Sequence, residues 1–263
     1  MKILLFKSTQ ESQPDKFESA LISATHLNAT PQTVPVITFN FINLDQLGQK
    51  LESHGDYTGI IFSSPRCVSA VEKASQSDPN LVQIWGTKQI FCVGRSTAEC
   101  ASKLFNNSLN IVTSRDENAE SLGHQIVQDC KMSEKKSRLL YPCGNLKTGT
   151  IQNILTASTS NVDTDTVVVY ETVENPQLGQ LMSNLSIEED SPFVFFSPSG
   201  LNYAIRHAKE MIVCDHRPLI AIGGTTKDAL LKIGGVVDSN VLQCESPSPE
   251  TLVKCVELII ARR

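Results

Sequence analysis

The sequence lacks the short motifs that mark the commonest catalytic sites. It contains no Gly-x-Ser-x-Gly elbow, no Walker loop, no Gly-x-Gly-x-x-Gly and no His-Glu-x-x-His. The five histidines are scattered along the chain, and none is close in sequence to another. A nucleophile-elbow hydrolase, a P-loop enzyme, a dinucleotide-binding dehydrogenase and a zinc protease are therefore all disfavoured.

Long apolar runs and cysteine pairs are also missing. Only Ile3–Phe6 are apolar before Lys7, which is too short for a signal-peptide core, and no run approaches the ~18 apolar residues that span a bilayer. The eight cysteines include no Cys-x-x-Cys pair, and several lie in apolar patterns such as Phe91–Val93. We interpret them as reduced thiols and not as zinc ligands, and we expect a cytoplasmic protein with no metal and no membrane association.

Basic residues are fewer than acidic ones, with 23 Lys and Arg against 28 Asp and Glu. The net charge of −5 argues against a protein that binds nucleic acid, since such proteins are usually basic. It does not argue against an anionic small ligand, because backbone amides can hold anions without net positive charge.

Short apolar strands alternate with helical patterns along the whole chain. This alternation predicts an α/β fold with parallel sheets covered by helices, and 263 residues suit one large domain or two of ordinary size.

Three pairs of segments recur about 130 residues apart, in one register. Gly59–Arg66 recurs as Phe193–Gly200, Ile90–Thr97 as Leu219–Thr226, and Ala119–Leu122 as Pro249–Leu252. The beginnings repeat too, since Lys2–Lys7, a helix and Thr33–Val36 parallel Arg138–Pro142, a helix and Thr166–Val169. Each repeat is thus a short front part and a longer back part, which could pack in tandem or with the front parts exchanged. The residues alone do not choose between these arrangements.

Hydroxyl- and glycine-containing turns follow the repeated strands. Ligands bind at the carboxyl ends of strands in open parallel sheets, and helix N-termini there attract carboxylates or phosphates. A serine or threonine at such a turn is by itself usually only a helix cap. Two matched sets at equivalent strand ends favour a shared ligand site in the cleft between two duplicated halves. The turns are Ser63–Arg66, Gly94–Thr97, Cys143–Lys147, Ser197–Gly200 and Gly223–Thr226.

Three further side chains are candidates because of their positions. Arg66 and Lys147 follow strands, where they are either solvated charges or ligand contacts, and Tyr170 ends the strand Val167–Tyr170. A tyrosine at that position is by default a half-buried strand residue.

Taken together, these segments resemble the uroporphyrinogen-III synthase family, in particular its animal members. The resemblance spans nearly the whole chain and depends on the order and spacing of stretches that are individually weak. Gly224 and Thr148 depart from the residues common in the animal members. The stretches are Met1–Lys7, Phe62–Val68, Val93–Gly94 with Thr97–Ala98, Pro142–Lys147, Val169–Val173, Phe195–Leu201, Ala221–Gly223 with Thr225–Thr226, and Glu245–Pro249.

The resemblance implies the exchanged packing of the repeats. One discontinuous α/β domain is expected over 1–35 and 172–263, and an inserted α/β domain over 38–169. Crossover strands at 35–38 and 168–172 are expected to form a two-stranded neck that lets the domains open and close.

The resemblance also implies a reaction. Hydroxymethylbilane, a linear tetrapyrrole with eight carboxylates, would lose its hydroxyl as water and cyclise with inversion of its last pyrrole ring. The enzyme would be a lyase that mainly positions the chain ends and needs no cofactor or metal. We expect a monomer that takes its substrate by transient hand-over from hydroxymethylbilane synthase.

Site roles follow from the same resemblance. Tyr170 is expected to donate a proton to the departing hydroxyl, as the catalytic residue. The expected substrate-binding residues are Ser64, Arg66, Thr97, Gly144, Asn145, Lys147, Ser197, Ser199, Gly200, Thr225 and Thr226.

Two other functions remain open at this point. A non-catalytic two-lobed binding protein for a small anion would bind a ligand without turnover. A nucleotide-sugar transferase would need an acidic or basic constellation for the nucleotide, which the sequence does not offer.

Overall fold

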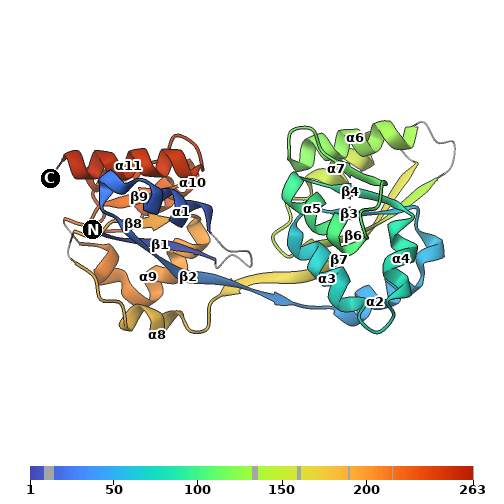
Figure 1. Ribbon diagram of the computed structural model, residues 1–263, viewed down its shortest axis with the longest axis horizontal. Coiled ribbons are helices and arrows are strands. Elements are labelled where there is room, and N and C mark those ends of the chain that lie inside the picture. The colour runs from blue at the N-terminus through green and yellow to red at the C-terminus, as the bar shows by residue number, and fades with distance from the viewer. Residues whose placement is uncertain (9–14, 132–135, 159–160, 189, 215, 263) are drawn as a thin grey trace. The chain divides into compact units, whose positions relative to one another are not determined.

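The chain divides into two units, and each has a hydrophobic core on either face of its sheet. The computed structural model describes residues 1–8, 15–131, 136–158, 161–188, 190–214 and 216–262 (Figure 1). Unit 1 consists of Met1–Thr38 and Val173–Arg263, and unit 2 of Phe39–Thr172. The chain leaves unit 1 in strand β2 (Thr30–Phe41) and returns in strand β7 (Val162–Glu174). That the two units act as separate domains stays a prediction.

Unit 1 is built on a parallel sheet with the strand order β10-β9-β8-β1-β2. Because the strands are parallel, the connections between them cross over the sheet and carry the helices that cover its faces. The elements other than β2 are β1 (Lys2–Ser8), α1 (Lys16–Ser23), the 3-10 helix Thr25–Leu27, α8 (Leu178–Ser183), β8 (Phe193–Phe195), α9 (Pro198–Ile212), β9 (Leu219–Ala221), α10 (Gly224–Leu231), the 3-10 helix Asp238–Asn240, β10 (Val241–Gln243) and α11 (Pro249–Ala261).

The central strand β1 supplies both cores of unit 1. Leu4 and Phe6 pack with α8, α9 and α10 on one face, and Ile3 and Leu5 pack with α1 and α11 on the other. All four are fully buried, which is why this strand reads as a continuous apolar run.

Unit 2 repeats this plan with the strand order β7-β6-β3-β4-β5, again parallel. Its elements other than β7 are α2 (Leu44–Glu52), the 3-10 helix His54–Asp56, β3 (Gly59–Phe62), α3 (Pro65–Ala74), α4 (Asn80–Gly86), β4 (Gln89–Cys92), α5 (Arg95–Leu104), β5 (Ile111–Thr113), α6 (Ala119–Lys131), β6 (Ser137–Gly144) and α7 (Thr150–Ser158).

Strand β3 shows how the faces of unit 2 are covered. Ile60 and Phe62 face the core formed with α2, α3, α4 and α5, whereas Ile61 faces the core formed with α6 and α7. The predicted α/β class, with a mostly parallel sheet flanked by helices, is confirmed. Within the described residues, no helix combines the length and the apolar character needed to cross a membrane.

Candidate active site

The strands of unit 2 end around one hollow of about 220 Å³. Its walls come from the residues at or just after the carboxyl ends of β3, β4 and β6, from the last part of β7 and from the start of α6. Three predicted site residues, Gly144, Lys147 and Tyr170, belong to this lining. The complete lining is Ser63, Val93, Ala119, Tyr141, Gly144, Leu146, Lys147, Thr148, Tyr170 and Thr172.

Tyr170 lies directly against Gly144 on the neighbouring strand. A Cβ atom at Gly144 would lie 2.5 Å from Cζ of Tyr170 and 2.7 Å from its hydroxyl oxygen, so no larger residue fits without moving the ring. The prediction that Tyr170 ends its strand was wrong, because β7 continues to Glu174. Tyr170 is instead the last β7 residue paired with β6, after a register shift between Cys143 and Gly144.

The hydroxyl of Tyr170 is held by Ser64. The Ser64 Oγ lies 3.2 Å from the Tyr170 hydroxyl, and either group can be the donor. Burial raises the pKa of Tyr170, and the hydrogen bond with Ser64 and the charge of Arg66 only partly oppose this shift. Tyr170 is therefore a protonated phenol at neutral pH, able to donate a proton.

Phe39 in β2 connects Arg66 to Tyr170, and the sequence reasoning missed it. The Arg66 guanidinium lies 3.4 Å from the centre of the Phe39 ring, in a close cation–π contact. The Phe39 ring meets the Tyr170 ring edge to face at 6.1 Å between centroids. Arg66 is thus fixed on an aromatic face beside Tyr170, at the start of α3.

The loop after β6 fixes the end of β7. The Asn145 backbone N–H donates to the Tyr170 carbonyl at 3.0 Å, and the Asn145 Oδ1 accepts from the Thr172 N–H at 3.1 Å. The exposed Lys147 places its Nζ 2.9 Å from the Gln152 Oε1 and 5.9 Å from the centre of the Tyr141 ring. Asn145 therefore orders the strand that carries Tyr170, while Lys147 is a cation at the rim of the hollow.

The turns at the starts of α3 and α5 differ from the expected capping. Ser64 occupies the N-cap position of α3, but its side chain makes no capping hydrogen bond and binds Tyr170 instead. Gly94 is the N-cap of α5 in an extended conformation, so this position does not need a left-handed glycine. Thr97 is 3% exposed, so its side chain is not accessible to a ligand. The groups that could bind a ligand at this turn are the backbone amides.

A second phenol, Tyr141 of β6, lines the same hollow and was also missed. Burial raises the pKa of Tyr141 to about 12, and the Ser63 hydroxyl only partly opposes this shift. Ser63 and Ser64 both contact the thiol of Cys67, with Oγ–Sγ distances of 3.6 Å and 3.4 Å. The signal in the sequence was a tyrosine two residues before the Cys143–Lys147 turn, on the strand face that also carries Leu139.

Unit 1 contains the remaining predicted residues, at the same strand ends of its own sheet. Ser197 caps α9, since its Oγ accepts the Gly200 N–H at 3.1 Å, as its sequence position predicts. A Cβ atom at Gly200 would lie 2.9 Å from the Val36 Cγ2, so this glycine permits β2 to pass closely. Thr226 is 2% exposed near the start of α10. Ser199 is partly buried and Thr225 is exposed. Their part in binding a substrate stays a prediction.

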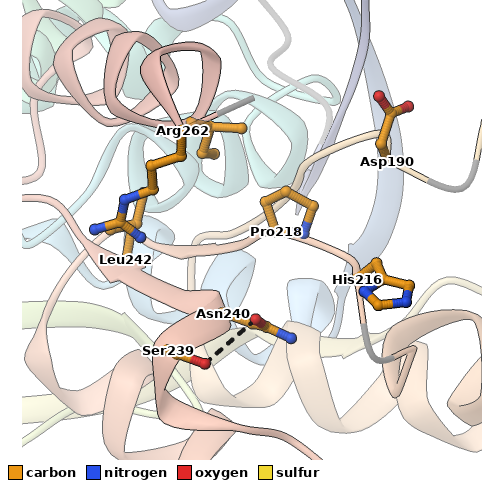
Figure 2. A pocket seen from close by; sticks show the side chains of 8 residues that line it. Asp190, His216, Pro218, Ser239, Asn240, Leu242 and Arg262 are labelled. Atoms are coloured by element: carbon orange, nitrogen blue, oxygen red, sulfur yellow. Dashed lines mark hydrogen bonds between the residues drawn. The ribbon is translucent and has the colours of Figure 1, made fainter.

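Another hollow, of about 330 Å³, lies in unit 1, at the amino ends of strands β9 and β10 (Figure 2). Pro218 precedes β9 and Asn240 precedes β10, so these side chains belong to the amino ends of the strands. Ligands of parallel α/β sheets bind at the carboxyl ends, and the candidate active site is therefore the hollow in unit 2. Figure 2 shows the lining residues, which are Asp190, His216, Pro218, Ser239, Asn240, Leu242, Ile259 and Arg262.

The comparisons with known proteins identify the family. The chain is similar to uroporphyrinogen-III synthetase from Helicobacter pylori, with 18% identity over all of both chains and a TM-score of 0.63. It is also similar to a mutant of uroporphyrinogen III synthase from Thermus thermophilus, with 13% identity over 99% of this chain and 100% of that one and a TM-score of 0.52. At these identities the likeness shows a common fold. The family model described as uroporphyrinogen-III synthase HemD matches residues 19–254, and the chain therefore belongs to the uroporphyrinogen-III synthase family.

Proposed function

We propose that this protein cyclises hydroxymethylbilane to uroporphyrinogen III, with inversion of the last pyrrole ring and loss of water. Family membership supports this reaction and does not favour the alternative of a non-catalytic anion-binding protein. The observation that carries the proposal is the protonated phenol of Tyr170, held against Gly144 in the hollow where the strands of unit 2 end.

The first chemical step needs an acid. The hydroxyl of the substrate leaves as water once it receives a proton, and an azafulvenium cation remains on the first ring. Tyr170 can supply this proton, because its raised pKa keeps the phenol protonated and Ser64 can stabilise the oxygen that remains. The proton that the last ring loses when the final bond closes restores the phenol, so the overall reaction releases only water.

The steps that follow need the reacting ends of the substrate held in position more than they need acid or base catalysis. The cation attacks the substituted carbon of the last ring, and the spiro intermediate breaks and recloses with that ring inverted. The open chain can also close unaided to the uninverted isomer, so the enzyme must hold the chain ends in one arrangement.

The enzyme can hold the chain ends by binding the carboxylates of the substrate. We assign Arg66 and Lys147 to carboxylate binding, since both carry positive charge beside the Tyr170 hollow. The backbone amides at the starts of α3, α5, α9 and α10 are the further anion-binding groups, as helix N-termini facing a ligand would be.

The remaining assignments follow from the reaction. The protein is an enzyme of haem biosynthesis by its family. We propose that it is a lyase, because the proposed reaction removes water from its substrate. We further propose the animal type, a cytoplasmic monomer, an activity independent of metals and cofactors, and transient hand-over of the substrate from hydroxymethylbilane synthase.

The test is to mix the purified protein with freshly generated hydroxymethylbilane and to separate the product isomers. We expect the inverted isomer to form faster than the uninverted isomer forms without protein. Formation of the uninverted isomer alone, at the spontaneous rate, contradicts the proposal.

A further inference from the structure

Two cysteine thiols of unit 1 lie in contact with each other. Cys244 directly follows β10, and Cys255 lies in the second turn of α11. Their Sγ atoms are 3.7 Å apart, within reach of a hydrogen bond between thiols. Both residues are buried, with 1% and 5% of their surfaces exposed, and the cyclisation proposed above uses neither.

The fold holds this pair of thiols together at both ends. The Cys244 N–H donates to the Ala221 carbonyl at 2.9 Å, which ties this cysteine to the end of β9. The Thr251 hydroxyl donates to the Ser246 carbonyl, which ties the start of α11 to the loop that connects the two cysteines. The contact between the sulfur atoms is therefore built into the packing of α11 on the sheet.

A third hollow, of about 430 Å³, lies beside α11 and reaches one of the two thiols. Both cysteines are in the described part of the chain, and of the two only Cys255 belongs to its lining. A solute as small as hydrogen peroxide that enters this hollow meets Cys255 first. The lining is Gln243, Glu245, Thr251, Lys254, Cys255, Glu257, Leu258 and Ala261.

The contact also makes the two thiols chemically different. With both protonated, the Cys255 thiol donates to the Cys244 sulfur. When Cys255 has lost its proton, Cys244 becomes the donor, and this hydrogen bond lowers the pKa of Cys255, whereas burial and the charge of Glu245 only partly oppose the shift. The same hydrogen bond, together with burial, raises the pKa of Cys244. Since the thiolate is the nucleophilic form of cysteine, the accessible Cys255 is the thiol that reacts.

We propose that Cys255 and Cys244 form an oxidisable thiol pair, which hydrogen peroxide entering the hollow beside α11 converts to a reversible disulfide. This modification site goes beyond the proposed cyclisation and does not depend on it. In a reducing compartment such a disulfide is transient, and it forms only when an oxidant is present.

Two water molecules leave when peroxide oxidises the pair. The Cys255 thiolate attacks one peroxide oxygen, an S–O bond forms as the O–O bond breaks, and the leaving oxygen takes a proton and departs as water. Cys244 then loses its proton, and its sulfur attacks the Cys255 sulfur, so that an S–S bond replaces the S–O bond and a second water departs. The Sγ atoms must approach by about 1.7 Å to reach the length of a disulfide bond.

The test treats the purified full-length protein with hydrogen peroxide, blocks the remaining thiols in denaturant and identifies the tryptic peptides without reduction. Trypsin cleaves after Lys232, Lys254 and Arg262, so the disulfide would join peptides 233–254 and 255–262, each of which contains one cysteine. We expect these peptides to be found linked, and to separate on treatment with dithiothreitol. Unlinked peptides with both cysteines reduced overturn the proposal.

Cys130 of unit 2 is an internal control in the same sample. It is 8% exposed and lines a hollow of about 190 Å³, in which no other cysteine is present among the described lining residues, and burial raises its pKa. We expect Cys255 to be oxidised at least about ten-fold faster than Cys130. Equal rates would show that exposure alone decides the reaction, and would overturn the proposal.

Two variants of Cys244 test the roles of the two thiols. Cys244→Ser keeps a hydrogen-bond donor but cannot form the disulfide, so peroxide should leave a sulfenic acid on Cys255, which dimedone traps on peptide 255–262. Cys244→Ala removes the donor, and trapping should be about three-fold slower or more. Absence of the dimedone adduct from folded Cys244→Ser, or equal trapping in both folded variants, overturns the assignment of Cys255 as the activated thiol. The linked peptides and the comparison with Cys130 use the wild-type chain alone, so they test the proposal even if a variant fails to fold.

Discussion

Replacing Gly144 by alanine should displace Tyr170, the proposed proton donor, without removing its phenol. The added Cβ would lie 2.5 Å from the Tyr170 Cζ and 2.8 Å from its Cε2. Carbon atoms in contact prefer about 3.5–4.0 Å, so the ring must retreat by about 1 Å. A misplacement of that size can cost about 10²-fold in rate, and we expect kcat to fall by about 10- to 100-fold in Gly144→Ala.

The assay is the initial rate of inverted-isomer formation at saturating hydroxymethylbilane, with a thermal melt of each variant to establish that it is folded. Gly55→Ala is the control, because a Cβ at Gly55 in the same unit meets nothing within 4 Å. It should retain the wild-type rate and melting temperature. A folded Gly144→Ala protein with wild-type kcat would refute the argument that Tyr170 works from this position.

Further predictions test the other parts of the site. Tyr170→Phe keeps the ring and removes the hydroxyl, so kcat should fall ten-fold or more while the fold survives; wild-type turnover in that variant would make Tyr170 a packing residue. Since the pKa of Tyr170 is raised, ionisation of this phenol should cause no loss of kcat below about pH 10, and a loss near neutrality that is absent from Tyr170→Phe would contradict the assignment. Arg66→Ala and Lys147→Ala should raise KM more than they lower kcat, and the reverse pattern would argue against carboxylate binding. Dialysis against a strong chelator should leave the rate unchanged, whereas a loss that zinc restores would show that a metal is needed.

The duplicated strand–turn–helix pattern could be predicted from the sequence because buried parallel strands read as unbroken apolar runs. Ile60–Phe62 and Phe193–Phe195 are such runs, and both are buried on each face of their sheets. A proline at the start of the next helix marked where α3 and α9 begin. Fold class and strand ends were therefore within reach of local reasoning.

The contacts that make the site specific could not be predicted in this way. Ser64 reaches Tyr170 across 106 residues, and Phe39 lies 131 residues before it. These contacts depend on the strand order β7-β6-β3, which places β3 two strands from β7, and on the register shift that sets Tyr170 beside Gly144. Neither the strand order nor the register shift leaves a periodic signal in the local sequence.

The hydrogen-bond partner of the Ser64 side chain also could not be predicted from the local sequence. Its position before Pro65 is typical of a helix cap, and the backbone indeed turns there, but the hydroxyl binds a tyrosine from another strand. A local pattern could locate the turn, whereas the partner of the hydroxyl was decided by tertiary packing.

Ring inversion is the central claim, and it can be measured directly with hydroxymethylbilane labelled with ¹³C at its hydroxymethyl carbon. After reaction with the purified protein, the product is analysed by ¹³C NMR. The account predicts that the labelled bridge carbon joins the first ring to an inverted last ring in nearly all of the product. A labelled bridge joined to an uninverted last ring, in the proportion found without protein, would contradict it.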